Sequence, residues 1–196
     1  MGKKEYMDFQ KKLAFHSAPA LLGVKSANLI SLKNSEFDLD SHIKIFRARV
    51  KGTGLNIKLL CSCENSSLIL LYNEKLLSES LKRPYVKKFL VSCGYNDNEN
   101  IDTHLETLSS RISCSPEFPH EIGIFLDYPF EDIIGFIRNK GRNFKMCGYW
   151  KVYSDTEYAN RTFTYYDKCR EFLCYKLNCG CDIYQAIKNP QEVFSI

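Results

Sequence analysis

The sequence has no apolar run near the roughly 18 residues that a membrane-spanning helix needs, so we expect no membrane association. It contains no C-x-x-C pair, which argues against a zinc ribbon or an iron–sulfur cluster. It also lacks a glycine-rich phosphate loop, because Gly52-Thr53-Gly54 is too short for a Rossmann or P-loop motif. The N-terminal segment lacks the apolar stretch of a signal peptide. We therefore expect a cytoplasmic protein without a metal site, and the sequence identifies no cofactor.

Composition limits the remaining classes of protein. The chain has 196 residues, of which 44% are hydrophobic and 13% aromatic, and this is enough to bury a substantial core. No linker divides the chain, so we expect a single domain, 1–196. The net charge of +4 is mild, which makes nucleic acid an unlikely partner. Nine cysteines, an odd number, indicate free and mostly buried thiols in a reducing compartment, and the oligomeric state stays open.

Hydrophobic periodicity predicts an α/β fold of the mixed α+β kind. Two apolar runs around Glu64-Asn65-Ser66 indicate a β-hairpin. The pattern Ser154-Asp155-Thr156-Glu157 resembles a capping box that begins a long helix ending near Asn178. The predicted strands are 27–33, 55–63, 67–73, 120–126 and 148–153. We expect a single mixed sheet of about four to five strands covered by helices, with a C-terminal strand–helix–strand–helix unit.

Three segments carry a resemblance to a known family. They read HSAPALLGVKSANL (16–29), FPHEIGIFLDYPFEDIIGFIRNKGRNFKMCGYWKVYSD (118–155) and YYDKCREFL (165–173). In these segments the chain resembles a family of uncharacterised proteins from clostridia and their relatives, domain of unknown function 3793. The chain departs from the family pattern at Ser17 and Asp127, where cysteine and glycine are usual. The resemblance implies no activity, only an association of the family's genes with flavodoxin and iron-uptake genes.

The segment 120–153 predicts where a site lies. If its two strands are parallel, the helix between them crosses over in the right-handed sense and ends beside the amino ends of both strands. The segment from His16 to Lys25 joins this edge if the first strand runs the same way. We therefore expect one ligand-binding constellation, in which His16, His120 and Arg142 line one concavity. Its members are His16, Lys25, His120, Glu121, Lys140, Arg142, Asn143, Lys145 and Tyr149.

Ordinary structural roles explain part of this pattern. Lys140 at a helix end complements the helix dipole, an interaction worth about 0.3–1 kcal/mol. A bond to the backbone at a strand start explains His120, whose neighbour Glu121 faces the other way on a regular strand. The basic loop 142–145 is explained less well, because it follows the end of the helix.

Two functional hypotheses follow. In the first, the basic and aromatic edge binds a phosphate- or carboxylate-bearing small molecule, or docks an acidic redox protein such as flavodoxin, so that the protein is a binding accessory. In the alternative, the protein is a small enzyme that uses His120, Glu121 or Cys147 in an anion-binding pocket. The enzyme needs two of these side chains to converge, and the sequence assigns no catalytic residue.

Overall fold

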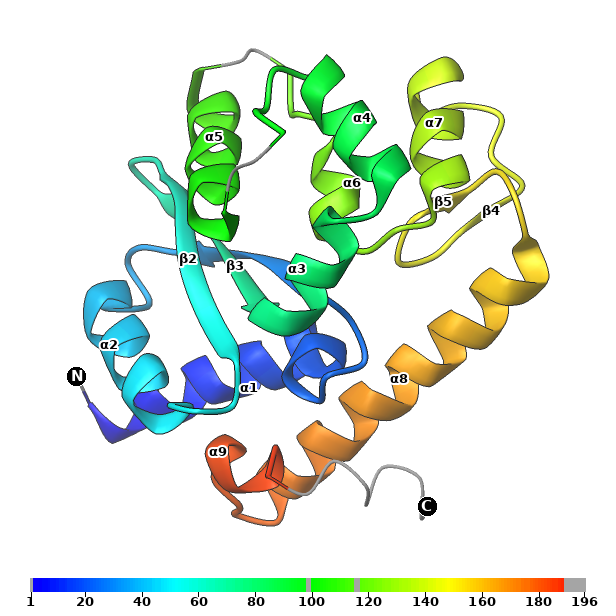
Figure 1. Ribbon diagram of the computed structural model, residues 1–196. Helices are drawn as coiled ribbons and strands as arrows, with labels where there is room; N and C mark the ends of the chain where they lie inside the picture. Colours follow the sequence, from blue (N-terminus) through cyan, green and yellow to red (C-terminus); the bar gives the residue numbers. More distant parts are fainter. Residues whose placement is uncertain (1, 98–99, 115–116, 189–196) are drawn as a thin grey trace.

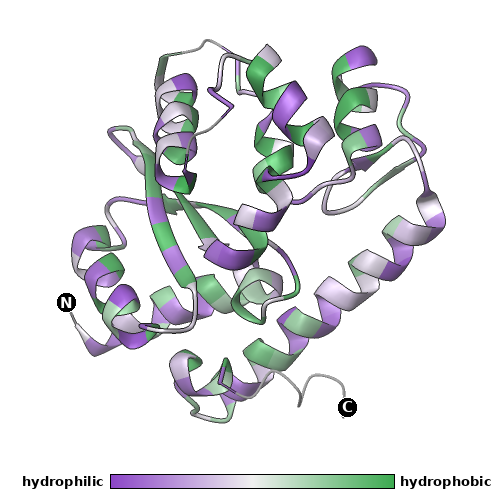
Figure 2. Ribbon diagram, viewed as in Figure 1, coloured by the Kyte–Doolittle hydropathy of each residue, from purple (hydrophilic) through white to green (hydrophobic). Residues whose placement is uncertain are grey.

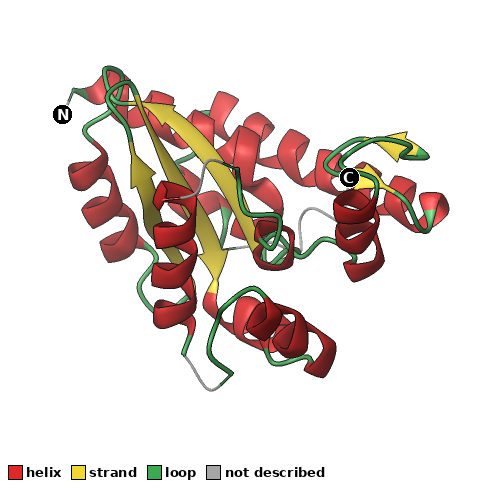
Figure 3. Ribbon diagram, turned by 90° about the horizontal axis from the view of Figure 1, so that it is seen from above, coloured by secondary structure: helices red, strands yellow, loops and turns green. Residues whose placement is uncertain are grey.

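The computed structural model describes residues 2–97, 100–114 and 117–188, and the strands in these residues form two separate sheets (Figure 1). The larger sheet is antiparallel, with the strand order β1-β3-β2. Its strands are β1 (Ala27–Lys33), β2 (Leu55–Ser62) and β3 (Ser66–Asn73). The smaller sheet is a hairpin of β4 (Met146–Cys147) and β5 (Lys151–Val152), which lies apart from the larger sheet when seen from above (Figure 3).

Helices enclose the larger sheet on both faces (Figures 1 and 3). In chain order the described helices are α1 (Lys3–Leu21), α2 (Leu39–Arg49), α3 (Glu74–Leu81), α4 (Pro84–Ser92), α5 (Ile101–Cys114), α6 (Ile122–Phe125), α7 (Phe130–Arg138), α8 (Thr156–Asn178) and α9 (Ile183–Ala186). Helices α1, α2, α8 and α9 share one apolar cluster with the sheet, and α3 to α6 share another with its opposite face. None of the described helices combines the length and hydrophobicity needed to cross a membrane.

Alternating apolar side chains let the larger sheet bury both faces. Ile57, Ile69 and Leu71 contribute to the cluster with α1 and α8. Leu70 and Tyr72 contribute to the cluster on the other face. Fully burying a side chain of this size contributes about 1.5–3 kcal/mol. Figure 2 shows hydrophobic residues on these strands and on the helices beside them. The two apolar clusters both include residues of the strands, so the sheet is the centre of the core.

Several predicted elements are confirmed. The hairpin around Glu64-Asn65-Ser66 is present as β2 and β3, and the first predicted strand is β1. The long C-terminal helix is α8, which ends at Asn178 as predicted. Its N-cap is Asp155 rather than Ser154, because Asp155 Oδ1 accepts hydrogen bonds from the backbone N of Glu157 (3.0 Å) and Tyr158 (2.9 Å).

The mixed α+β class is confirmed, but the single sheet of four to five strands and the strand–helix–strand–helix unit are wrong. Residues 120–126 contain the short helix α6 instead of a strand. Residues 122–126 are all buried, and an apolar run buried on every side fits a strand or a helix equally well. The predicted strand 148–153 supplies only β5, which pairs with β4 and not with the larger sheet. Both described sheets are therefore antiparallel, and the crossover predicted within 120–153 does not form. The connection that does cross over runs from β1 through α2 to β2, past the central strand β3.

All nine cysteines are free, but only Cys169 is buried, so the expectation of mostly buried thiols is wrong. Within the described residues, His, Cys, Asp and Glu side chains form no group of three that could hold a metal ion. That the chain is a single domain, 1–196, stays a prediction.

Candidate functional site

Asp132 in α7 organises the segment that leads into the site. Its side chain is 2% exposed and accepts hydrogen bonds from Trp150 Nε1 (2.7 Å), Tyr153 N (2.8 Å), and Ser154 N (2.7 Å) and Oγ (2.8 Å). A buried carboxylate requires donors of this kind. The carboxylate therefore joins α7, the β4–β5 hairpin and the start of α8, and Trp150 has a structural role.

Tyr149 precedes Trp150 and connects the hairpin to α8. Its hydroxyl donates to Asp167 Oδ1 (2.8 Å), and its backbone O accepts from Tyr128 OH (3.1 Å). Burial raises the pKa of Tyr149, and the hydrogen bond to Asp167 raises it further. Burial raises the pKa of Tyr128 to about 12. Both phenols therefore stay protonated near neutral pH.

Lys25 lies in the turn between α1 and β1. The carbonyl oxygen of Pro19 accepts a hydrogen bond from Lys25 N (3.2 Å), and Gly23 adopts a left-handed conformation with φ of 70°. The Lys25 side chain is only 2% exposed. Its amine lies over the rings of Tyr128 (5.0 Å to the centroid) and Tyr166 (5.6 Å).

The surroundings of the Lys25 amine disfavour its charged form. Burial lowers the pKa of Lys25 from 10.5 to about 8, and the charge of Asp127 opposes this shift only in part. No carboxylate of a described residue lies within 4.0 Å of the amine. Asp127 Oδ1 instead forms an ion pair with Arg83 Nη1 (3.9 Å). The aromatic rings solvate the ammonium weakly and do not replace a counter-ion.

Lys25 lines a cavity of about 340 Å³ that collects side chains from distant parts of the chain. We call it the Lys25 cavity, and its walls are Phe15, His16, Lys25, Asn28, Leu29, Leu126, Tyr128, Tyr149 and Arg170. Three of these residues are basic, and no acidic residue is among the described residues that line it. Asn28 Oδ1 is buried and has no hydrogen-bond partner among the described residues. The cavity thus offers positive charge and an unused acceptor.

Arg170 projects from α8, and its guanidinium carbon lies 5.9 Å from the ring centroid of Tyr149. One of its nitrogens, Nη2, donates to Asp167, and a guanidinium has five N–H donors in all. His16 on α1 has an exposed side chain, but neighbouring protein atoms still remove part of the water around its ring. This desolvation lowers the pKa of His16, and the charges of Lys12 and Arg170 lower it further. The His16 ring is therefore mainly neutral near pH 7, when it both donates and accepts hydrogen bonds.

The structure separates the nine predicted site residues. The Lys25 cavity is lined by His16, Lys25 and Tyr149. A separate groove of about 790 Å³ is lined by His120 and Lys140. Neither the cavity nor the groove includes Arg142, Asn143 and Lys145, which are exposed in the segment before β4. The expected concavity shared by His16, His120 and Arg142 is therefore not formed by the described residues, because the parallel strands that would align them are absent.

Glu121, the ninth residue, is 3% exposed and lies in an ion pair. Its Oε1 accepts hydrogen bonds from Tyr95 OH (3.3 Å) and from Arg111 Nε. His120 is exposed in the turn before α6, and Cys147 is exposed on β4. These three candidate catalytic side chains share no cavity among those that the described residues form.

Sequence reasoning missed Asn28, Asp132 and Arg170. A signal for Arg170 was present, because the segment YYDKCREFL contains it. Asp132 resembles any acidic residue in the first turn of a helix, and no local pattern marks its burial. Asn28 is a single polar residue in a mostly apolar strand, and only its surroundings in the folded protein show that its side chain is buried without a partner for Oδ1.

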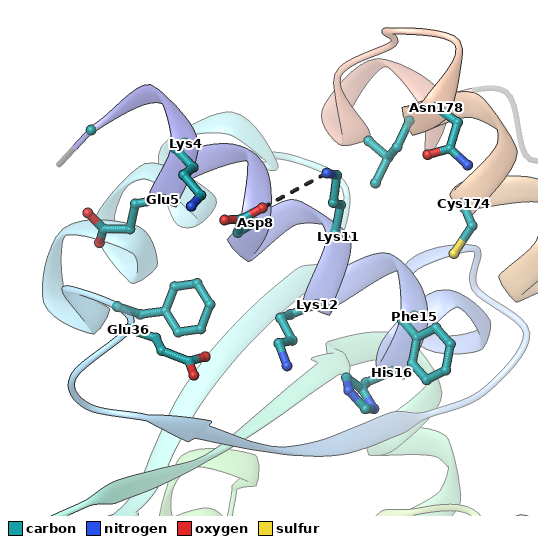
Figure 4. Close-up of a pocket in the computed structure, with 13 residues that line it drawn as sticks. Lys4, Glu5, Asp8, Lys11, Lys12, Phe15, His16, Glu36, Cys174 and Asn178 are labelled. Carbon is teal, nitrogen blue, oxygen red and sulfur yellow. Dashed lines mark ion pairs between the residues drawn. The ribbon is translucent and has the colours of Figure 1, made fainter.

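His16 also lines a larger groove of about 910 Å³ along α1 (Figure 4). Its charged side chains have both signs, and they are Lys4, Glu5, Asp8, Lys11, Lys12 and Glu36. Asp8 Oδ1 pairs with Lys11 Nζ at 3.9 Å, the contact drawn dashed in Figure 4. Mixed and paired charges do not favour an anion, so the Lys25 cavity is the better candidate site.

The fold and the cavity define a mixed α+β protein in which distant segments enclose a cationic cavity. The sequence model of a family described as "Protein of unknown function (DUF3793)" matches residues 13–187, and the chain belongs to this family. No curated protein and no solved structure matches the chain.

Proposed function

We propose that the protein binds a small carboxylate- or phosphate-bearing molecule in the Lys25 cavity. The buried Lys25 amine carries this proposal, since no described residue supplies a carboxylate within 4.0 Å of it. Burying an ammonium ion without a counter-ion costs several kcal/mol, and an anionic ligand would offset this cost. The volume of about 340 Å³ suits a small ligand, since ligand pockets typically measure about 300–1,000 Å³.

The three segments that resemble the family support the same cavity. Segment 16–29 supplies His16 and Lys25, segment 118–155 supplies Tyr149, and segment 165–173 supplies Arg170. A binding accessory needs no catalytic residue. The alternative, an enzyme that uses His120, Glu121 or Cys147, has less support because these side chains do not converge.

Docking of an acidic redox protein, such as a flavodoxin, is a second candidate. It rests on Phe144, which is 40% exposed beside the exposed Arg142 and Lys145. An exposed ring flanked by cations suits an acidic protein surface. Nine free thiols support a cytoplasmic setting for either function.

Titration calorimetry with inorganic phosphate and with acetate tests the main proposal. We expect the wild-type protein to bind at least one of them, and Lys25→Met and Arg170→Met to bind it roughly tenfold more weakly or worse. Lys12→Met is the matched control. Lys12 is exposed on the same helix as His16 but does not line the Lys25 cavity, so its affinity should stay within about twofold.

Equal affinity in the wild-type protein and in Lys25→Met would contradict the proposal, as would the absence of binding for both anions. For the second candidate, an acidic partner retained equally at low and high salt would count against docking at Arg142 and Lys145.

A further inference from the structure

We infer that Lys25 captures a carbonyl group covalently, forming an imine with a 2-oxo acid whose carboxylate is held by Arg170 and His16. This inference rests on the proposed anion binding and names both the class of ligand and the step that follows binding.

The position of Lys25 fits a nucleophile better than a simple anion-binding residue. Its amine is enclosed by Tyr128 and Tyr166 and has no carboxylate of a described residue within 4.0 Å. Lysine amines become nucleophiles when burial in a pocket disfavours their charge, and burial is the condition met at Lys25. Arg170 lines the same cavity and is available to bind the carboxylate of the ligand.

The protonation state supports this role. With a pKa of about 8, on the order of a tenth of the Lys25 amines are neutral at pH 7. An ordinary lysine with a pKa near 10.4 has a neutral fraction below roughly 0.1% at that pH. Only the neutral amine can attack a carbonyl carbon.

The other residues of the cavity match the remaining groups of a 2-oxo acid. A guanidinium binds a carboxylate through two parallel hydrogen bonds, and Arg170 keeps donors beyond the one that it gives to Asp167. A volume of about 340 Å³ restricts the ligand to a short chain. The unused acceptor, Asn28 Oδ1, suits the N–H of an iminium ion, a donor that a bound carboxylate does not provide.

The step is balanced without an oxidant or a reductant. The neutral Lys25 amine adds to the keto carbon, so that a C–N bond forms and the carbonyl oxygen takes up a proton. The resulting carbinolamine loses its hydroxyl group as water while the C=N bond forms. Overall, one ammonium and one 2-oxo acid give one iminium and one water, and the proton first lost from the ammonium returns to the departing oxygen.

Reductive trapping tests the inference. The full-length protein is incubated with pyruvate and sodium cyanoborohydride, and the adducts are located by intact mass and peptide mapping. We expect one adduct per chain at Lys25. Lys25→Arg should remove it, and the matched exposed control Lys12→Arg should keep it. Arg170→Met should slow trapping of pyruvate by roughly tenfold but leave trapping of acetaldehyde, which has no carboxylate, within about twofold.

Calorimetry with pyruvate and lactate distinguishes a failure of imine formation from a failure of anion binding. If both bind but cyanoborohydride traps no pyruvate at Lys25, imine formation is refuted and the anion-binding function stands. If neither binds, both fail. Adducts spread evenly over the exposed lysines would also overturn the inference. Far-UV circular dichroism verifies that each variant is folded.

Discussion

Two regions of the molecule combine lysine with aromatic rings, and they use the lysines differently. On the β4–β5 hairpin, Lys145 Nζ donates to Ser154 O (2.7 Å), and Lys151 Nζ donates to Gly141 O (2.8 Å). In the Lys25 cavity the amine faces two rings and has no carboxylate of a described residue within 4.0 Å. Both regions are rich in basic and aromatic residues, yet the lysines of the hairpin bond to backbone carbonyl groups.

We therefore propose Lys25, which has no carboxylate of a described residue within 4.0 Å, and not the lysines of the hairpin, as the functional residue. A surface lysine that bonds to a carbonyl costs little to place, because water solvates the rest of its ammonium. A buried lysine without a counter-ion lowers stability, and such a cost is typical of functional residues.

The largest effect that we expect comes from removing the anchor of the hairpin. Asp132→Ala leaves the Trp150 indole N–H and two backbone N–H groups without their acceptor, and it should lower the free energy of unfolding by about 3–5 kcal/mol. Urea denaturation followed by Trp150 fluorescence measures the loss. Glu131→Ala, an exposed neighbour on α7, is the control and should cost less than about 0.5 kcal/mol. Similar losses in both variants would show that Asp132 is not the anchor.

Lys25→Met should act in the opposite direction. In anion-free buffer at pH 7 this substitution should raise the free energy of unfolding by roughly 3 kcal/mol, because it removes a buried charge whose pKa is lowered from 10.5 to about 8. Thermal and urea denaturation measure the gain.

The pH dependence of this gain gives a sharper test. In wild-type protein Lys25 loses its proton near pH 8 when folded and near pH 10.5 when unfolded. The unfolded state therefore binds more protons between these values, so the stability of the wild-type protein rises with pH there. The advantage of Lys25→Met should be complete below pH 8 and should shrink towards pH 10.5. An advantage that stays constant across this range would mean that Lys25 is not buried as an ammonium.

A smaller effect is expected at Gly148 in the hairpin. A Cβ at this position would overlap the ring of Phe163, so Gly148→Ala should cost about 1–3 kcal/mol through overpacking. Differential scanning calorimetry measures the loss. In the double variant Gly148→Ala/Phe163→Leu the two losses should be less than additive, and full additivity would mean that the two residues do not meet.

The smallest effect is expected at Lys145. Lys145→Met should change the free energy of unfolding by less than about 0.5 kcal/mol, and the affinity for phosphate or acetate should not change. The measurements are urea denaturation and titration calorimetry. A large loss of anion affinity would place the ligand on the hairpin instead of in the Lys25 cavity.

Local signals predicted several elements well. The strand alternation of β1 to β3 and the turn at Glu64-Asn65-Ser66 are properties of consecutive residues. The same is true of Asp155, which caps α8 through the backbone two and three residues further along the chain. Predictions of this kind succeed because the interactions that decide them span only a few residues.

Other predictions failed where distant contacts decide the outcome. The apolar run 122–126 is buried on every side and therefore carries no period from which strand and helix could be distinguished. Because residues 120–126 do not form a strand, the sheet edge at which the nine predicted site residues should meet does not exist. The sequence predicts His16, Lys25 and Tyr149 at that edge, but they line a cavity that also includes Arg170 from α8.

Local sequence patterns specify the mixed α+β class, the central hairpin and the long C-terminal helix, and the three segments that resemble the family supply all residues lining the cavity except Phe15. Hydrophobic period and capping are local, so each segment specifies them without its partners. The burial of Lys25 and Asp132 depends on the tertiary structure. The tertiary structure also supplies Asp132 with hydrogen-bond donors and leaves Lys25 with no carboxylate of a described residue within 4.0 Å. The free energy of a buried charge depends on what surrounds it, and residues far apart in the chain supply those surroundings.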